Sequence, residues 1–161
     1  MNQTIPVLDL QTFQKGDLAQ QIGFIQALKA ALQDLGFFAL TNHGIDANLI
    51  DAANRATTTV FELPSEVKSR YEDLNLHGQR GFTHFGREHA KDYPHPDLKE
   101  FWHIGRKTGT PANVWPTEVP DFQPVLTELF QQLEACALQL LQACALALAL
   151  PRDYFQDRVV D

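Results

Sequence analysis

Hydrophobic residues near the start of the chain form a strand-like run, then a helical spacing, then a second compact run. Residues 5–9 are β-prone. Residues 18–35 carry apolar side chains at helical spacing, with Asp17 in the N-cap position and Gly36 where a glycine commonly ends a helix. Residues 37–40 are all apolar, as in a buried strand. The pattern predicts a strand, a helix and a strand.

The next apolar positions predict two further helices. Asp46 can cap a helix that runs to about Phe61. Pro64 then interrupts the helical pattern, and a short third helix is expected to begin at Pro64 or Ser65 and to end near residues 71–72.

Glycines and prolines break up residues 72–120, so this segment is expected to be rich in loops. Short strands are expected only around residues 80–85 and 100–105. Alternation along the second strand would place Phe101 and His103 on the same face. Loop-rich segments of this kind commonly carry binding groups.

A long helix is expected over residues 121–150. Its apolar residues recur every three or four positions, and 13 of the 15 residues from 136 to 150 are apolar. The run is shorter than the ~20 residues that cross a bilayer, so no membrane span is expected. A helix that is apolar on all sides must be buried on all sides. The pattern therefore indicates a second covering layer from elsewhere, or self-association where that layer is lacking.

Composition narrows the class of protein. A chain of 161 residues with 44% hydrophobic and 20% charged residues suits one globular domain. Its net charge of −7 disfavours nucleic acid as a partner. No secretory signal pattern follows Met1, so a cytoplasmic location is expected. Cys136 and Cys144 are separated by about 12 Å of predicted helix, which is too far for a disulfide.

Six histidines raise the question of a metal site. Five lie within residues 77–103, and His95-Pro96-Asp97 has the H-x-D spacing of a facial triad for Fe(II). The only later histidine is His103, so the distant third ligand is missing. His84 and His89 lack the further ligands of a zinc site. We interpret both spacings as chance, and no residue is assigned as a metal ligand.

Two other kinds of site depend on serine and on arginine. Ser65 and Ser69 are the only serines, and no histidine lies near them in the sequence, so nucleophilic catalysis is disfavoured. Arg80, in the motif Arg80-Gly81-Phe82, could bind a carboxylate through both arms of its guanidinium group. A solvated arginine beside a turn is an equal alternative.

A series of short segments follows one order from end to end of the chain. The segments are residues 5–10, 36–45, 61–64 with Lys68, 80–82 with Gly86 and Glu88, 97–106, 113–116 and 150–155. Together they resemble the N-terminal region of the isopenicillin N synthase-like, Fe(II)/2-oxoglutarate-dependent oxygenases. Residues 97–102 and 113–116 look most like bacterial members.

The resemblance implies an α+β fold, the helical and short-strand N-terminal part of a double-stranded β-helix (jelly-roll) oxygenase whose core is incomplete in this chain. Residues 1–161 would form the N-terminal domain, and the catalytic jelly-roll domain would be absent. The family's H-x-D strand, distal histidine and Arg-x-Ser follow the matched region. No catalytic, metal-binding or cofactor-binding residue is therefore carried over, and only Arg80 and Phe82 are expected to bind substrate.

Three functional hypotheses follow. In the first, the chain is the N-terminal portion of an oxygenase that uses Fe(II) and 2-oxoglutarate to oxidise a small molecule. Its catalytic jelly-roll half would be missing or supplied by a separate chain, so this chain alone would bind neither cofactor and be inactive. The alternative is a non-catalytic binding module that docks its apolar C-terminal helix on a partner chain. A self-contained metal site on the histidine loop ranks last.

Overall fold

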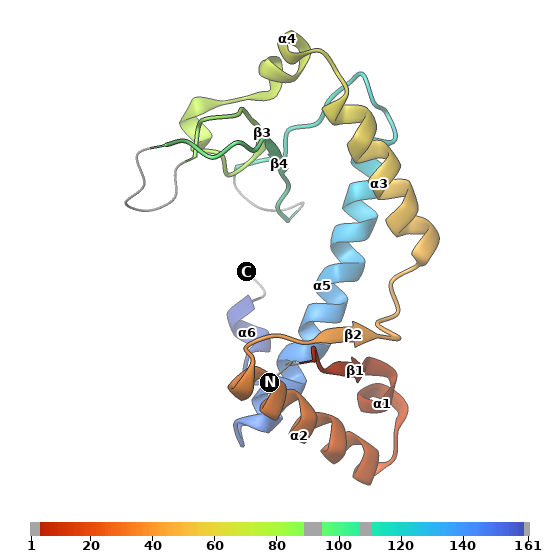
Figure 1. Ribbon diagram of the computed structural model, residues 1–161. Coiled ribbons are helices and arrows are strands. Elements are labelled where there is room, and N and C mark those ends of the chain that lie inside the picture. The colour runs from red at the N-terminus through yellow and green to blue at the C-terminus, as the bar shows by residue number, and fades with distance from the viewer. Residues whose placement is uncertain (1–3, 89–94, 107–110, 160–161) are drawn as a thin grey trace. The chain divides into compact units, whose positions relative to one another are not determined.

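The computed structural model describes residues 4–88, 95–106 and 111–159 (Figure 1). The chain divides into two compact units. The first unit contains residues Met1–Asp46 and Gln131–Asp161, and the second contains Ala47–Phe130. The longest helix, α5 (Phe122–Ala147), begins in the second unit and continues into the first.

The first unit is built on a pair of short parallel strands. Strand β1 (Val7–Asp9) pairs with β2 (Ala39–Thr41), and Leu8 lies opposite Leu40. Helix α1 (Leu10–Lys15) and helix α2 (Leu18–Asp34) connect the two strands. The predicted order of strand, helix and strand is thereby confirmed, and α1 is an additional short helix that the pattern did not reveal.

The ends of α2 follow the predicted local signals. The Asp17 side chain accepts a hydrogen bond from the Gln20 backbone N–H, and the Gln20 side chain accepts one from the Asp17 N–H, which completes a capping box. Gly36 has φ +85°, the left-handed conformation that glycine adopts readily after a helix. Both helix boundaries are thus encoded by a few adjacent residues.

A cluster of buried apolar side chains forms the core of the first unit. Its members are Leu8, Leu10, Phe13, Phe24, Leu28, Cys136 and Ala143. The Phe13 and Phe24 rings stack with centroids 5.5 Å apart. Residues before position 35 and residues after 135 therefore build one core, which explains why the second half of α5 is so apolar.

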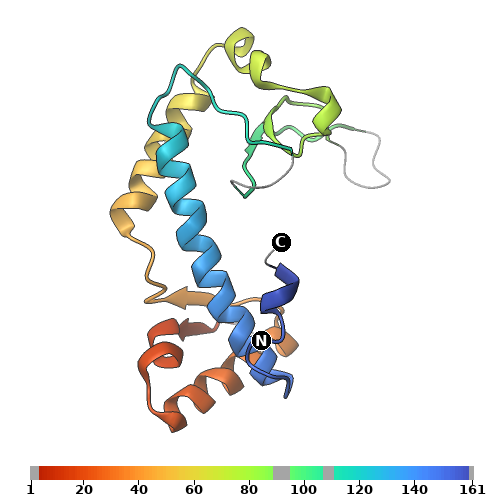
Figure 2. The same cartoon turned by 180° about the vertical axis from the view of Figure 1, so that it is seen from behind.

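Helix α5 is only partly covered by the residues that the structure describes. Ala143 and Ala145 are fully buried, whereas Leu133 is 49% exposed and Leu148, just past the helix end, is 61% exposed. The helix ends at Ala147, three residues earlier than predicted, and Ala149 adopts a left-handed φ of 57°. A short helix, α6 (Gln156–Val159), follows in the same unit (Figure 2).

The two cysteines of α5 are free, as predicted. Burial raises the pKa of both the Cys136 and the Cys144 thiol. A raised pKa keeps a thiol protonated and unreactive. The pair behaves as small apolar residues of the core.

The second unit combines helices with a short antiparallel hairpin. Helix α3 (Ala47–Phe61) matches the second predicted helix. The third predicted helix is shorter than expected, because α4 (Ser65–Lys68) tightens at once into a 3-10 turn, η1 (Ser69–Tyr71). A second 3-10 turn, η2 (Leu74–Leu76), leads to strand β3 (Gly81–Thr83), which pairs with β4 (Phe101–His103). Both strands lie inside the predicted ranges.

The core of the second unit is aromatic. The buried residues Ala56, Val60, Val119 and Phe122 pack with Leu63, Trp102, Ile104, Trp115 and Leu126. The Trp102 and Trp115 rings meet the Phe122 ring edge-on, with centroids 5.5 and 6.0 Å away. This core fixes β4 against the beginning of α5.

Among the described residues, no helix combines the length and the apolar character needed to cross a membrane.

Truncation of Leu28 should unfold the first unit more easily than truncation of its neighbour one turn away. Leu28 is 0% exposed and Leu32 is 40% exposed on the same helix. We expect Leu28→Ala to lower the free energy of unfolding by about 2–5 kcal/mol, because it leaves a cavity. Leu32→Ala should cost about 1 kcal/mol or less. Urea denaturation followed by circular dichroism measures both values, and equal losses would contradict this packing.

Candidate functional site

The β3–β4 hairpin presents two chemically different faces. Phe82 lies opposite Trp102 in the register, and their ring centroids are 6.2 Å apart. Phe82 is buried, and Trp102 packs against the core of the second unit. Thr83 pairs with Phe101, so these two residues share the other face with His103. The Phe101 and His103 rings lie 4.7 Å apart, which confirms the alternation predicted for this strand.

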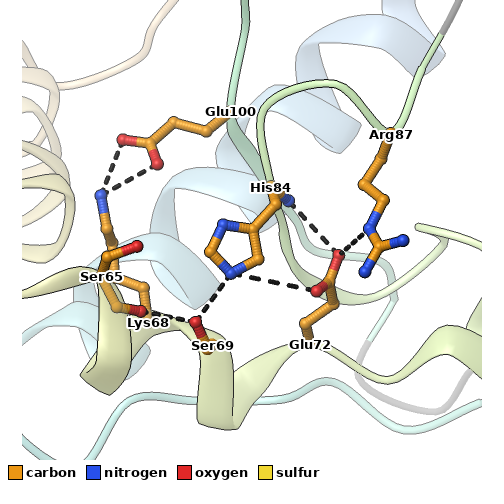
Figure 3. Close-up of polar contacts among 7 residues, drawn as sticks. All are labelled: Ser65, Lys68, Ser69, Glu72, His84, Arg87 and Glu100. Atoms are coloured by element: carbon orange, nitrogen blue, oxygen red, sulfur yellow. Dashed lines mark hydrogen bonds and ion pairs between the residues drawn. The ribbon is translucent and has the colours of Figure 1, made fainter.

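A buried ion pair connects α4 to the residue that precedes β4. Lys68 Nζ donates hydrogen bonds to Glu100 Oε1 at 2.8 Å and to Glu100 Oε2 at 2.9 Å (Figure 3). It also donates one to the Phe61 carbonyl oxygen at 2.9 Å. The Lys68 and Glu100 side chains are only 8% and 17% exposed. Three hydrogen bonds use all three protons of the ammonium group. Nζ also lies 5.4 Å from the centre of the Phe82 ring.

A second polar cluster brings together residues that are far apart in the sequence. Ser69 Oγ is 2.7 Å from His84 Nε2, and Glu72 Oε2 is 4.0 Å from the same nitrogen (Figure 3). Glu72 Oε1 accepts hydrogen bonds from the His84 backbone N–H at 3.4 Å and from Arg87 Nε at 3.3 Å. Sequence reasoning missed the pairing of Ser69 with His84, because their contact depends on the turn that follows α4.

The geometry of this cluster does not form a nucleophilic triad. Ser69 Oγ lies 2.6 Å from the Ser65 carbonyl oxygen, to which it donates its only proton. It therefore accepts a hydrogen bond from His84 Nε2. Glu72 faces the same nitrogen, whereas in a triad the carboxylate contacts the other ring nitrogen. The cluster connects η1, the end of β3 and Arg87, and its observed role is structural.

The two residues predicted to bind substrate lie in different environments. Phe82 is 1% exposed and belongs to the aromatic packing of the second unit. The Arg80 guanidinium group lies directly against Gly105, where an added Cβ would overlap it. Arg80 Nη1 donates to the Gln79 carbonyl oxygen at 2.6 Å, and Arg80 Nε is buried without a partner among the described residues.

The peptide beside Arg80 is fixed by an asparagine. The Asn113 side chain accepts a hydrogen bond from the Gly105 N–H and donates one to the Gly105 carbonyl oxygen, each at 2.8 Å. Asn113 thereby satisfies both backbone hydrogen-bonding groups of Gly105, and neither group depends on the Arg80 guanidinium group for a partner. Only glycine at position 105 allows the guanidinium group this close.

The histidines do not gather into an iron site in the described part of the chain. No group of three or more His, Cys, Asp or Glu side chains there could bind a metal ion. In the H-x-D motif, Asp97 lies 3.4 Å from Lys99 Nζ, and the hydrogen bonds to Glu88 and Asp97 raise the pKa of Lys99. His43 Nδ1 accepts a hydrogen bond from the Ile45 N–H at 3.1 Å, and His89 lies outside the described residues. The described residues of this set do not fit Fe(II).

Comparison with known proteins identifies the class to which this fold belongs. Residues 5–124 match the family model described as the N-terminal region of non-haem dioxygenase in morphine synthesis. The chain belongs to this family. The resemblance noted in the sequence is therefore confirmed.

Two curated relatives of the chain are named as dioxygenases. The leucoanthocyanidin dioxygenase of Perilla frutescens is 29% identical over 96% of this chain and 43% of its own length. The validamycin A dioxygenase of Streptomyces hygroscopicus subsp. limoneus is 29% identical over 76% of this chain and 37% of its own length. The chain spans less than half of the length of these relatives.

Solved structures agree with this assignment. A putative 2OG-Fe(II) oxygenase family protein of Caulobacter crescentus has a TM-score of 0.81 and 34% identity, over 95% of this chain and 51% of its own. A full-length Neurospora crassa protein, solved in complex with alpha-KG and thymine, has a TM-score of 0.82 and 26% identity, over 94% of this chain and 50% of its own. The α+β arrangement seen here thus matches about half of each of these two structures.

Removal of the Lys68 ammonium group should destabilise the second unit strongly. We expect Lys68→Met to lower the free energy of unfolding by about 3–5 kcal/mol, because it leaves the Glu100 carboxylate buried without its cation. Lys99→Met is the matched control, since Lys99 is exposed and pairs with Glu88 at 2.6 Å on the surface. Thermal unfolding should show a large shift for the first variant and none for the second. Equal shifts would refute the assignment.

Proposed function

We propose that the chain is the N-terminal portion of an Fe(II)- and 2-oxoglutarate-dependent oxygenase that acts on a small molecule. The observation that carries the proposal is the family match over residues 5–124, together with coverage of about half of each related oxygenase. Residues 1–161 would form one N-terminal domain, and a jelly-roll half outside these residues would complete the enzyme.

The cofactors of the complete enzyme would bind outside this chain. When bound there, Fe(II) and 2-oxoglutarate would supply the activation of O₂, with 2-oxoglutarate oxidised to succinate and CO₂. The described residues contain no side-chain group that fits the metal. The contribution of this chain is then to support the catalytic half and to shape the approach of the substrate.

The first unit exposes apolar side chains that a second half would cover. Ile5, Val7, Leu18, Ile22, Leu32 and Phe37 are between 40% and 74% exposed. In the described residues the β1–β2 sheet has two strands, so the outer edge of each strand pairs with no other described strand. Exposed edges and apolar surface of this kind favour association with another protein surface.

The alternative function is a binding module without catalysis. Leu133 of α5 and Leu148 beyond its end are exposed and apolar, which suits docking of this region on a partner chain. A lone chain with this surface would self-associate. The two functions differ in whether the partner surface carries the iron ligands.

Arg80 is the residue that we propose to contact the substrate. Its buried Nε lacks a partner among the described residues, and an unpaired buried donor costs about 1–3 kcal/mol. A carboxylate on the substrate would pair with the positive charge of the guanidinium group. Phe82 is 1% exposed, so we give it the role of fixing β3 below Arg80.

Assays of succinate release test whether this chain is inactive alone and whether the proposed second half supplies the activity. The 161-residue chain with Fe(II), 2-oxoglutarate and O₂ should release no succinate above the buffer blank. A protein expressed from the coding sequence that continues beyond Asp161 should release it and should contain an H-x-D…H segment. Alanine in place of the first histidine of that segment is the control and should abolish release. Succinate release by the 161-residue chain, or a continuation without iron ligands, would reject the proposal.

The role of Arg80 is tested in the complete enzyme. We expect Arg80→Gln to raise the KM of a carboxylate-bearing substrate by about 10-fold or more, because the charged partner is lost, while kcat changes little. Arg70→Gln is the control, since Arg70 is 68% exposed and lies 4.0 Å from Glu118. Steady-state kinetics give both constants. An unchanged KM for Arg80→Gln would remove Arg80 from the substrate site.

A further inference from the structure

Gly105 lies where a side chain would collide with the arginine that we propose to contact the substrate. A Cβ added at Gly105 would overlap the Nη2 and Cζ atoms of Arg80, and the next nearest atom is Arg80 Nε. The guanidinium group therefore occupies the space that the side chain of any other residue at position 105 would need.

The backbone of Gly105 does not itself require glycine. Gly78, Gly81 and Gly86 have φ angles between 73° and 77°, a conformation that favours glycine. Gly105 is not among the residues with a positive φ, so other residues can adopt its conformation. At Gly81 an added Cβ would also meet the Tyr71 carbonyl oxygen of the backbone, whereas at Gly105 it meets only a flexible side chain. Glycine at position 105 thus provides space for the guanidinium group.

The three nitrogen atoms of the Arg80 guanidinium group have different surroundings. Nη1 donates a hydrogen bond to the Gln79 carbonyl oxygen at 2.6 Å, and Nε is buried. Nη2 has no partner among the described residues, and it does not belong to their buried unpaired atoms. Nη2 is therefore the nitrogen with free N–H groups, and it is also an atom that a side chain at Gly105 would displace.

The positive charge of Arg80 is not neutralised within the described ranges. No carboxylate there forms an ion pair with it, because the ion pairs between described side chains use other cations: Lys68, Arg70, His84, Arg87 and Lys99. A guanidinium group with free N–H groups and no anionic partner suits a carboxylate, which it binds through charge-assisted hydrogen bonds.

The Gly105 peptide is held in place beside the guanidinium group. Asn113 makes two hydrogen bonds to it, each at 2.8 Å. The next residue, Val114, accepts a hydrogen bond from Trp102 Nε1 at 3.1 Å, which connects this segment to the aromatic core. Movement of Gly105 away from Arg80 would break the bonds to Asn113. A side chain at position 105 would therefore displace the guanidinium group and not the backbone.

We infer that Gly105 is a specificity-determining position for the contact between Arg80 and a substrate carboxylate. The absence of a side chain at Gly105 leaves Nη2 in a position to donate to the carboxylate, and a methyl group there would turn Nη2 away. The inference rests on the substrate role of Arg80 in the proposed function. Recognition of a neutral molecule would not depend on this position.

Solvent exchange of the Arg80 Nε–H proton tests the placement of the guanidinium group in the uniformly ¹⁵N-labelled 161-residue chain. Because Arg80 Nε is buried and Arg70 is 68% exposed, the Arg80 proton should exchange about 10-fold more slowly. Arg80→Gln and Arg70→Gln identify the two signals by their loss. Gly105→Ala should bring the Arg80 rate close to that of Arg70. Gly23→Ala is the control and should leave the rate unchanged, since a Cβ at Gly23 meets no atom within 4 Å.

Titration with sodium benzoate tests the binding of a carboxylate at the same place. We expect saturable shifts of the Arg80 Nε–H signal and of the amide signal at position 105. Benzamide has nearly the same shape without the charge and should produce neither shift at the same ionic strength. Gly105→Ala should weaken benzoate binding by about 3-fold or more, because the guanidinium group is displaced. In an Arg80→Gln background, Gly105→Ala should cause no further loss, since the two substitutions remove one interaction.

Four outcomes would overturn the inference. An exchange rate or a benzoate affinity that Gly105→Ala leaves unchanged would show that position 105 does not place the guanidinium group. Additive losses from Gly105→Ala and Arg80→Gln would show that Gly105 acts without Arg80. Backbone amide spectra show whether Gly105→Ala is folded, and an unfolded variant would contradict a displacement confined to the guanidinium group.

The fourth outcome is the absence of any benzoate response in the unmodified chain. It would remove the carboxylate role of Arg80 and the inference with it. The oxygenase assignment is tested separately by succinate release, which plays no part in these measurements. Failure of the inference and failure of the oxygenase function are therefore distinguishable.

Discussion

The pairing of Lys68 with Glu100 is the contact on which the second unit depends. The ammonium group has all three of its protons in hydrogen bonds, to the end of α3 and to the residue before β4. A lysine is almost never this buried without a partner. Because the pair connects three segments around Phe82, it sets the position of the β3–β4 hairpin and thus of Arg80 and the Ser69–His84 cluster.

The first unit depends on apolar packing rather than on an ion pair. Its core is purely apolar and joins the beginning of the chain to the second half of α5. The helix was expected to need cover on all sides, and the structure shows cover on part of it. The exposed leucines and the short two-stranded sheet agree with a molecule whose relatives are about twice as long. The interpretation of this surface as a docking site for a catalytic half is a proposal.

The family was readable in the sequence, and the geometry of the site was only partly so. The positions of α2, α3, α5 and the two hairpin strands followed from periodicity, capping residues and glycine or proline breaks. Arg80 stood out in the sequence as an arginine among glycines, but its contact with Gly105 was not visible there. The pairing of Ser69 with His84 and the burial of Phe82 were missed, because each depends on how turns bring separate segments together.

The sequence by itself determined the local elements, the limits of α2 and the free cysteines, since each depends on residues close together in the chain. It also determined the membership of the dioxygenase family, which depends on the order of short segments along the chain. Only the tertiary structure decided which polar groups meet. Lys68 and Glu100 are 32 residues apart, and Ser69 and His84 are 15 apart, and no periodic pattern relates them. Lys68 and Glu100 pair because burial forces a charged group to find a partner, whereas the contact between Ser69 and His84 is exposed. In both cases the choice of partner depends on the packing of the whole unit.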